Sequence, residues 1–123
     1  MRELRAVYPD PRSAVLPALQ LAQAEHGGWL PEDAFRVVAE ELDTTPAYCL
    51  SIASFYDMFR LEPVGEHVVE VCTNVSCGLR GAQQVVETFE RELGIRAGTS
   101  TDEVTLRTVE CLGGCGWATI VAI

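Results

Sequence analysis

The sequence predicts an α+β protein, with a helical N-terminal half followed by a half made of strands and one long helix. In residues 1–60, apolar side chains recur at helical spacing between proline and threonine start signals. From residue 61 onward, short β-branched runs flank a single amphipathic stretch. Pro63 and Gly65 mark the connection between the two patterns. We therefore expect a helical bundle at 1–60 and an α/β domain at 61–123.

Three helices are expected in the first half. Ser13 is placed to cap the first, which should end at the His-Gly-Gly sequence of residues 26–28. The second should begin near Pro31, and the third has Thr45 as its cap and Pro46 at its first position. Helices this short are marginal alone, so they should pack against one another.

The second half should follow the order strand, helix, strand, strand. Strands are expected at 67–71, 104–109 and 118–123, a helix at 81–93, and a threonine-rich loop at 98–102. This order places two pairs of cysteines in loops just beyond strand ends. Loops on a rigid scaffold are the usual position of a functional site.

Charge and hydropathy exclude several classes of function. The net charge of −9 argues against nucleic-acid binding and against an anionic membrane surface, and it favours a protein partner with a basic patch. No N-terminal stretch resembles a signal peptide, and no apolar run approaches the roughly 20 residues that span a bilayer. We therefore expect a reducing compartment, in which cysteines bind metal or act chemically more often than they form disulfides.

Four of the five cysteines form two close pairs, Cys72 with Cys77 and Cys111 with Cys115, and 33 residues lie between the pairs. Four thiolates from two loops can hold a metal centre. The four- and three-residue spacers are loose for a zinc knuckle and suit the wider [2Fe–2S] cluster. Structural zinc and unligated thiols stay open as alternatives. The absence of a Cys-x-x-Cys motif disfavours thioredoxin-like dithiol exchange.

Glycines surround both cysteine pairs. We expect them to let the backbone approach a cluster closely and to direct N–H groups at its sulfurs. The glycines in question are Gly78, Gly113, Gly114 and Gly116.

Other conspicuous side chains have simpler interpretations. Cys49 lies in the third expected helix and should be a core residue. His26 and His67 stand at the ends of expected elements and should be structural. For Arg80, an ordinary solvated side chain and a role in offsetting cluster charge are equally plausible. Core packing between the helical bundle and the sheet is favoured over a docking patch for four further residues, Phe55, Tyr56, Met58 and Phe59.

Several segments resemble the thioredoxin-like [2Fe–2S] ferredoxins that form the small subunit of the NADH-dehydrogenase module of respiratory complex I. Related subunits occur in NAD-reducing hydrogenases and NAD-dependent formate dehydrogenases. The resemblance extends over nearly the whole chain. The matching segments are HGGWL at 26–30, ASFY at 53–56, CTNVSC at 72–77, LRG at 79–81 and VECLGGC at 109–115.

The resemblance implies that Cys72, Cys77, Cys111 and Cys115 ligate one [2Fe–2S] cluster, in a thioredoxin-like domain that follows a helical bundle. It implies a non-catalytic electron-transfer subunit whose cluster exchanges electrons with the FMN of an NADH-oxidising flavoprotein subunit. The chain itself would bind neither NADH nor FMN. As part of complex I it would be peripheral, on the cytoplasmic side of the membrane. The alternatives are the equivalent subunit of a hydrogenase or formate dehydrogenase, and an adaptor domain held by zinc on four cysteines.

Two features depart from the family pattern. Residues 116–119 read Gly-Trp-Ala-Thr where the family usually has an Ala-Pro step, and Trp117 is placed to shield the cluster loop from water. The family also continues with a fourth strand and a closing helix, whereas this chain ends at Ile123, inside the third expected strand. The resemblance thus implies a thioredoxin-like domain truncated at its C-terminus. A partner covering the edge, an incomplete chain and a shortened sheet all remain open explanations.

Overall fold

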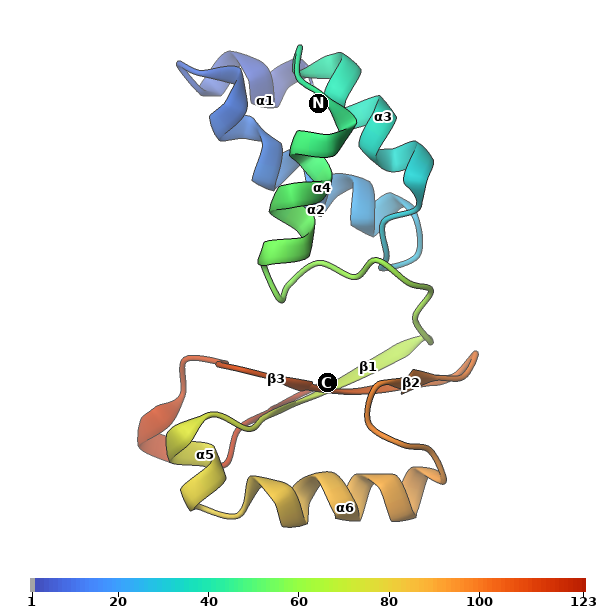
Figure 1. Cartoon of the computed structure of the whole chain (residues 1–123), viewed down its shortest axis with the longest axis vertical. Coiled ribbons are helices and arrows are strands. Elements are labelled where there is room, and N and C mark those ends of the chain that lie inside the picture. The colour runs from blue at the N-terminus through green and yellow to red at the C-terminus, as the bar shows by residue number, and fades with distance from the viewer. Residues whose placement is uncertain (1) are drawn as a thin grey trace. The chain divides into compact units, whose positions relative to one another are not determined.

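The computed structural model describes residues 2–123, which form two compact units, one ending at Pro63 and the other comprising Val64–Ile123 (Figure 1). The α+β class predicted from the sequence is confirmed, with four of the helices preceding the sheet. The first unit contains α1 (Arg2–Val7), a 3-10 helix (Pro11–Ala14), α2 (Val15–Glu25), α3 (Glu32–Glu41) and α4 (Pro46–Phe55). None of the helices in residues 2–123 has the length and apolar character needed to cross a bilayer.

The cap predicted for the start of α4 is confirmed, whereas the cap predicted for the start of α2 is not. The Thr45 hydroxyl accepts a hydrogen bond from the Tyr48 N–H at 3.2 Å, and Pro46 follows the cap. The predicted Ser13 cap is wrong. The Asp10 side chain instead caps the 3-10 helix, which runs directly into α2 at Val15 and leaves no free helix end for Ser13.

The core of the helical unit is made by α2, α3 and α4. Cys49 is 0% exposed, which confirms its interpretation as a core residue. Each helix contributes an apolar stripe too short to be stable alone, and mutual burial of the stripes holds the helices together. The largest side chains of this unit that are completely buried are Val15, Leu19, Leu30, Val38, Leu42 and Cys49.

A buried amide fixes the chain that leaves α4. The Gln23 side chain donates to the Met58 carbonyl at 3.0 Å and accepts from the Arg60 N–H at 2.8 Å. Gln23 is only 9% exposed, so both hydrogen bonds are largely shielded from water. The segment from Met58 to Arg60 is therefore held against α2.

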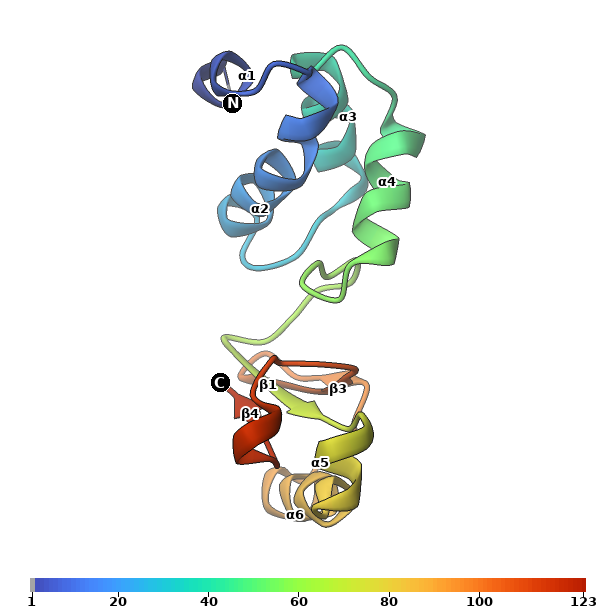
Figure 2. The ribbon, with the colours of Figure 1, turned by 90° about the vertical axis from the view of Figure 1, so that its left-hand side faces the viewer.

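The second unit contains a four-stranded mixed sheet in the order β2-β3-β1-β4 (Figure 2). Strands β1 and β3 are parallel, β4 is antiparallel to β1, and β2 is antiparallel to β3. The elements of this unit are β1 (His67–Cys72), α5 (Val75–Leu79), α6 (Ala82–Leu93), β2 (Thr99–Ser100), β3 (Val104–Val109), a 3-10 helix (Cys115–Trp117) and β4 (Val121–Ala122).

Two sequence expectations for this sheet are wrong in detail. The loop expected at 98–102 contains β2, because its backbone pairs with β3 although its side chains are exposed. The last strand is β4, which covers only Val121–Ala122 of the expected 118–123. The residues before it form a 3-10 helix and an irregular segment that packs against the cysteine loops.

Helix α6 lies along one face of the sheet (Figures 1 and 2). Val86 from the helix packs with Val69, Val71 and Leu106 from the strands. Because side chains alternate along a strand, Glu70 of β1 projects from the other face, where it forms an ion pair at 3.6 Å with Arg107 of β3. The helix ends at Gly94, whose φ of 68° lies in the left-handed region that favours glycine.

Of the four residues 55, 56, 58 and 59, only Phe59 is buried, at 4% exposed, and it packs in the core of the helical unit and not between the bundle and the sheet. Phe55, Tyr56 and Met58 are exposed, with Phe55 at 78%, so the prediction is wrong for these three. Phe55 is the last residue of α4 and does not share the buried side of Cys49 and Ala53, and Tyr56 and Met58 lie beyond the helix. The rings of Phe55 and Tyr56 instead contact each other edge to face, with centroids 5.1 Å apart.

We expect Gly65→Ala to destabilise the second unit by about 2–3 kcal/mol. A Cβ at residue 65 would lie 2.5 Å from the Val104 nitrogen and 2.7 Å from the Thr101 carbonyl oxygen, and these backbone atoms cannot move aside cheaply. Urea unfolding followed by circular dichroism would measure the loss. Gly116→Ala is the matched control, because a Cβ there meets nothing within 4 Å. Equal unfolding midpoints for the two variants would contradict the prediction.

Candidate metal centre

The parallel pairing of β1 with β3 brings the two cysteine loops to one edge of the sheet. Cys72, the last residue of β1, lies opposite Val109, the last residue of β3. The Thr73 N–H continues the ladder by donating to the Val109 carbonyl at 3.0 Å. Parallel strands end at the same edge, so the loop after Cys72 and the loop carrying Cys111 start side by side.

The first cysteine loop is a strand-to-helix turn. The Asn74 side chain caps α5 by accepting from the Val75 N–H at 2.6 Å. Helix α5 then places Cys77 on its buried side. The sequence did not predict this helix, because it is only five residues long and contains Gly78.

The second cysteine loop depends on two glycines. Gly113 has a φ of 73°, and its N–H donates to the Cys111 sulfur at 3.3 Å. A Cβ on Gly114 would lie 2.8 Å from the Ile120 side chain, so glycine permits this close contact. A Cβ on Gly116 would meet nothing within 4 Å, so packing does not require glycine there, and its expected approach to a cluster stays a prediction.

Backbone N–H groups surround the two inner sulfurs. Cys72 and Cys77 are 4% and 2% exposed. Asn74 and Leu112 donate N–H hydrogen bonds to the Cys72 sulfur, and Ile120 donates one to the Cys77 sulfur. The sequence did not identify these three donors. The glycine-rich spacing indicated that such donors exist, but their identity depends on the fold.

The two inner thiols affect each other's ionisation. Burial opposes ionisation of Cys72, but N–H donors from Asn74 and Leu112 together with the Cys77 thiol lower its pKa. For Cys77, the Ile120 N–H favours the thiolate, yet burial and the neighbouring Cys72 and Cys115 raise its pKa. The ionisation of each inner sulfur thus depends on the other as well as on the backbone donors.

The structure brings three of the four predicted ligands close enough for the thiols to affect one another's ionisation. Cys72 and Cys77 are hydrogen bonded, and Cys115 is close enough to Cys77 to affect its ionisation. Cys111 lies in the same loop as Cys115, and both are exposed. Within residues 2–123, no three His, Cys, Asp or Glu side chains form a group that is already close enough to hold a metal ion. The four-cysteine ligand set therefore stays a prediction.

The chemistry of the site nevertheless fits a sulfur-rich metal group. All four cysteines are free thiols, and N–H groups already face three of the sulfurs. Soft thiolates select iron–sulfur clusters or zinc, and hydrogen bonds to sulfur stabilise the charge that such groups carry. The inner wall is apolar and consists of Ala82, Val109, Leu112, Ala118 and Ile120.

The outer side of the site is rimmed by exposed apolar residues. Val75, Leu79 and Trp117 are 69%, 83% and 84% exposed. Beside them lies a hollow of about 500 Å³ that is lined in part by Leu79, Arg80 and Cys115. Trp117 therefore projects into solvent and does not shield the loop as expected. Exposed apolar residues gathered at one site are typical of an interaction surface.

Comparisons with known proteins give matches over most of the chain. The family model of the thioredoxin-like [2Fe-2S] ferredoxins matches residues 1–123. An NADH-quinone oxidoreductase subunit of Rhizobium meliloti (strain 1021) is 42% identical over 120 residues, covering 96% of this chain and 71% of the relative. The corresponding protein of Rickettsia bellii (strain RML369-C) is 42% identical over 114 residues, covering 91% of this chain and 68% of the relative. The corresponding protein of Rickettsia conorii (strain ATCC VR-613 / Malish 7) is 41% identical over 125 residues, covering 98% of this chain and 75% of the relative.

We expect iodoacetamide to modify Cys111 and Cys115 first in the metal-free protein, and Cys49 last. The first two thiols are exposed, whereas Cys49 is 0% exposed and burial raises its pKa. Peptide mass spectrometry over a time course would give the order, and labelling in denaturant should make all five equal. Modification of Cys49 as fast as Cys111 would contradict the structure.

Proposed function

The chain belongs to the thioredoxin-like [2Fe-2S] ferredoxin family, and on this basis we propose that it is the electron-transfer subunit of an NADH:quinone oxidoreductase. Cys72, Cys77, Cys111 and Cys115 are the proposed ligands of one [2Fe–2S] cluster. The observation that carries the proposal is the meeting of both cysteine loops at one sheet edge, in a chain whose whole length matches this family.

The four side chains have distinct tasks in this proposal. Cys72 and Cys77 provide an inner pair of ligands set by β1 and α5, and Cys111 and Cys115 provide an outer pair on a glycine-rich loop. A bound [2Fe–2S] cluster supplies one-electron redox chemistry. The N–H groups that face the sulfurs offset negative charge, and the apolar wall behind Cys72 limits access of water.

The proposed electron partner is a flavoprotein subunit that binds NADH and FMN. It would approach from the side of Cys111 and Cys115, because these two cysteines are exposed while Cys72 and Cys77 are buried. The apolar rim of Val75, Leu79 and Trp117 lies on that side. Hydride chemistry belongs to the partner in this proposal, and the chain's own contribution is to hold the cluster and present it.

The relatives favour complex I as the parent assembly. Those matched are named as subunits of NADH-quinone oxidoreductase, and none of these names refers to a hydrogenase or a formate dehydrogenase. We therefore place the chain in the peripheral arm of that complex, on the cytoplasmic side of the membrane.

Replacement of single ligands tests the cluster. In anaerobically reconstituted protein, Cys72→Ala and Cys111→Ala should each lose the visible absorption and the EPR signal obtained after dithionite reduction, because each removes one of four thiolates. Cys49→Ala is the matched control and should retain both signals, since Cys49 lies in the helical core. Iron and sulfide analysis would give the cluster content.

Two results would overturn the cluster assignment. A colourless protein that contains stoichiometric zinc would identify a structural zinc domain. An unchanged visible spectrum for Cys111→Ala would show that the ligand set is wrong. Purification of the native assembly with a hydrogenase or formate dehydrogenase subunit would leave the cluster in place and replace the parent complex.

A further inference from the structure

The side chain of Cys115 lines a hollow at the surface of the cysteine site. The hollow has a volume of about 500 Å³, and its other walls include Leu79 and Arg80, which follow the first cysteine loop. Cys115 is exposed, whereas Cys72 and Cys77 are only 4% and 2% exposed. A dissolved oxidant can therefore contact the Cys115 sulfur directly, while the two inner sulfurs are shielded from it.

Cys77 is the neighbour of both Cys115 and Cys72. The side chains of Cys72 and Cys77 are hydrogen bonded to each other, and Cys115 is close enough to Cys77 to affect its ionisation. Exchange between thiols and disulfides proceeds by attack of one sulfur on another, so it is favoured between neighbours. The three sulfurs thus form a continuous path from the surface to the buried pair.

Cys111 is also exposed but has different surroundings. Its sulfur accepts a hydrogen bond from the Gly113 N–H at 3.3 Å, within its own loop. Unlike Cys115, it does not line the hollow. The two exposed cysteines of one loop therefore make a matched pair for an experiment.

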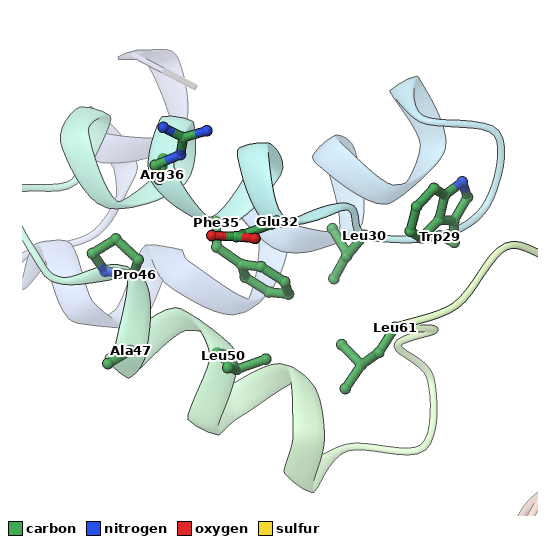
Figure 3. A pocket seen from close by; sticks show the side chains of 9 residues that line it. All are labelled: Trp29, Leu30, Glu32, Phe35, Arg36, Pro46, Ala47, Leu50 and Leu61. Carbon is green, nitrogen blue, oxygen red and sulfur yellow. The ribbon is translucent and has the colours of Figure 1, made fainter.

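Cys49 provides an internal reference, because it is 0% exposed in the core of the helical unit. A groove between α3 and α4 lies in the same unit, and Figure 3 shows the side chains that line it. They include Leu50 of α4, but no cysteine is among them. Solvent in this groove therefore does not reach the Cys49 sulfur, and a folded chain should keep Cys49 reduced.

We propose that Cys115, Cys77 and Cys72 form an oxidation relay in a chain that carries no metal group, in which hydrogen peroxide oxidises Cys115 and the oxidation ends as a disulfide between Cys72 and Cys77. Cys115 is the site of modification because its sulfur is exposed in the hollow. The buried pair is the end point because its two sulfurs are already in hydrogen-bonded contact. Rotation of the two side chains can bring these sulfurs to the bonding distance of about 2.05 Å.

The relay has three balanced steps. The Cys115 thiolate attacks one peroxide oxygen, so the O–O bond breaks, hydroxide leaves as water, and Cys115 is oxidised by two electrons to a sulfenic acid. The Cys77 thiolate then attacks the Cys115 sulfur, which forms an S–S bond and releases the sulfenic oxygen as a second water. Finally the Cys72 thiolate attacks the Cys77 sulfur, and Cys115 leaves as a thiolate that is protonated again.

The disulfide would close the site to a metal group until it is reduced, because it engages two of the four proposed ligands. It would also hold the oxidation at a level that thiols can reverse, whereas further oxidation of a sulfenic acid is irreversible. This inference goes beyond the proposed function. It uses the same four cysteines, but it does not depend on which metal they bind.

Peroxide treatment of the full chain, freed of metal by chelation and fully reduced beforehand, tests the relay. Trypsin leaves the first cysteine pair in peptide 61–80 and the second pair in peptide 108–123, so mass spectrometry after thiol alkylation identifies each disulfide. Peptide 61–80 should lose two hydrogens and resist alkylation. Peptide 108–123 should keep two alkylated thiols, and Cys49 should also be alkylated once the protein is denatured. Dithiothreitol should reverse the change.

Three variants test the order of the steps. Cys115→Ser should slow formation of the disulfide in peptide 61–80 at least about tenfold, because the inner thiols then lack their exposed neighbour. Cys111→Ser is the matched control, and its rate should stay within about twofold of the wild-type rate. Cys72→Ala should stop the relay one step early, with a Cys77–Cys115 disulfide that joins the two tryptic peptides.

Several outcomes would overturn the relay. These are a disulfide confined to peptide 108–123, a wild-type rate for Cys115→Ser, and the absence of joined peptides from Cys72→Ala. A mixture of pairings that includes Cys49 would also overturn it, because an unfolded chain gives such a mixture, and circular dichroism would record the folded state. Loss of the cluster assignment to zinc would leave this test unchanged, so the two failures are distinguishable.

Discussion

The site depends on the parallel register of β1 with β3. This pairing sets Cys72 opposite Val109, and everything that follows each strand begins at the same edge. Parallel strands need a long crossover, and here the crossover consists of α5, α6 and β2. The 33 residues that separate the cysteine pairs in sequence consist mostly of this crossover and of β3, and the parallel pairing brings the pairs to one edge.

Local signals were sufficient for much of this fold. The bounds of β3, the cap of α4 at Thr45 and the glycine end of α6 agree with the sequence, because each is set by neighbouring residues. Cys49 was correctly assigned to the core on the same grounds. Cys72 and Cys111 lie at or just beyond the ends of strands, as the β-strand patterns implied, whereas Cys77 lies in α5 and Cys115 in a 3-10 helix.

Features set by distant residues could not be predicted in this way. Strand β2 exists because its backbone pairs with β3, and its exposed Thr99 and Ser100 carry no strand pattern. The donors to the inner sulfurs include Leu112 and Ile120, whose N–H groups have no signature in sequence. The exposure of Trp117 likewise depends on how the second loop closes.

Ile120 links the site to the edge of the sheet. Its carbonyl accepts from the Cys72 N–H at 3.0 Å, its own N–H donates to the Cys77 sulfur, and its side chain packs on Gly114. Opening of the chain around β4 must therefore disturb both cysteine loops at once. The local opening free energy of this edge and the occupancy of the site are coupled quantities. Protection of the amides at 120–122 against hydrogen exchange would report on both.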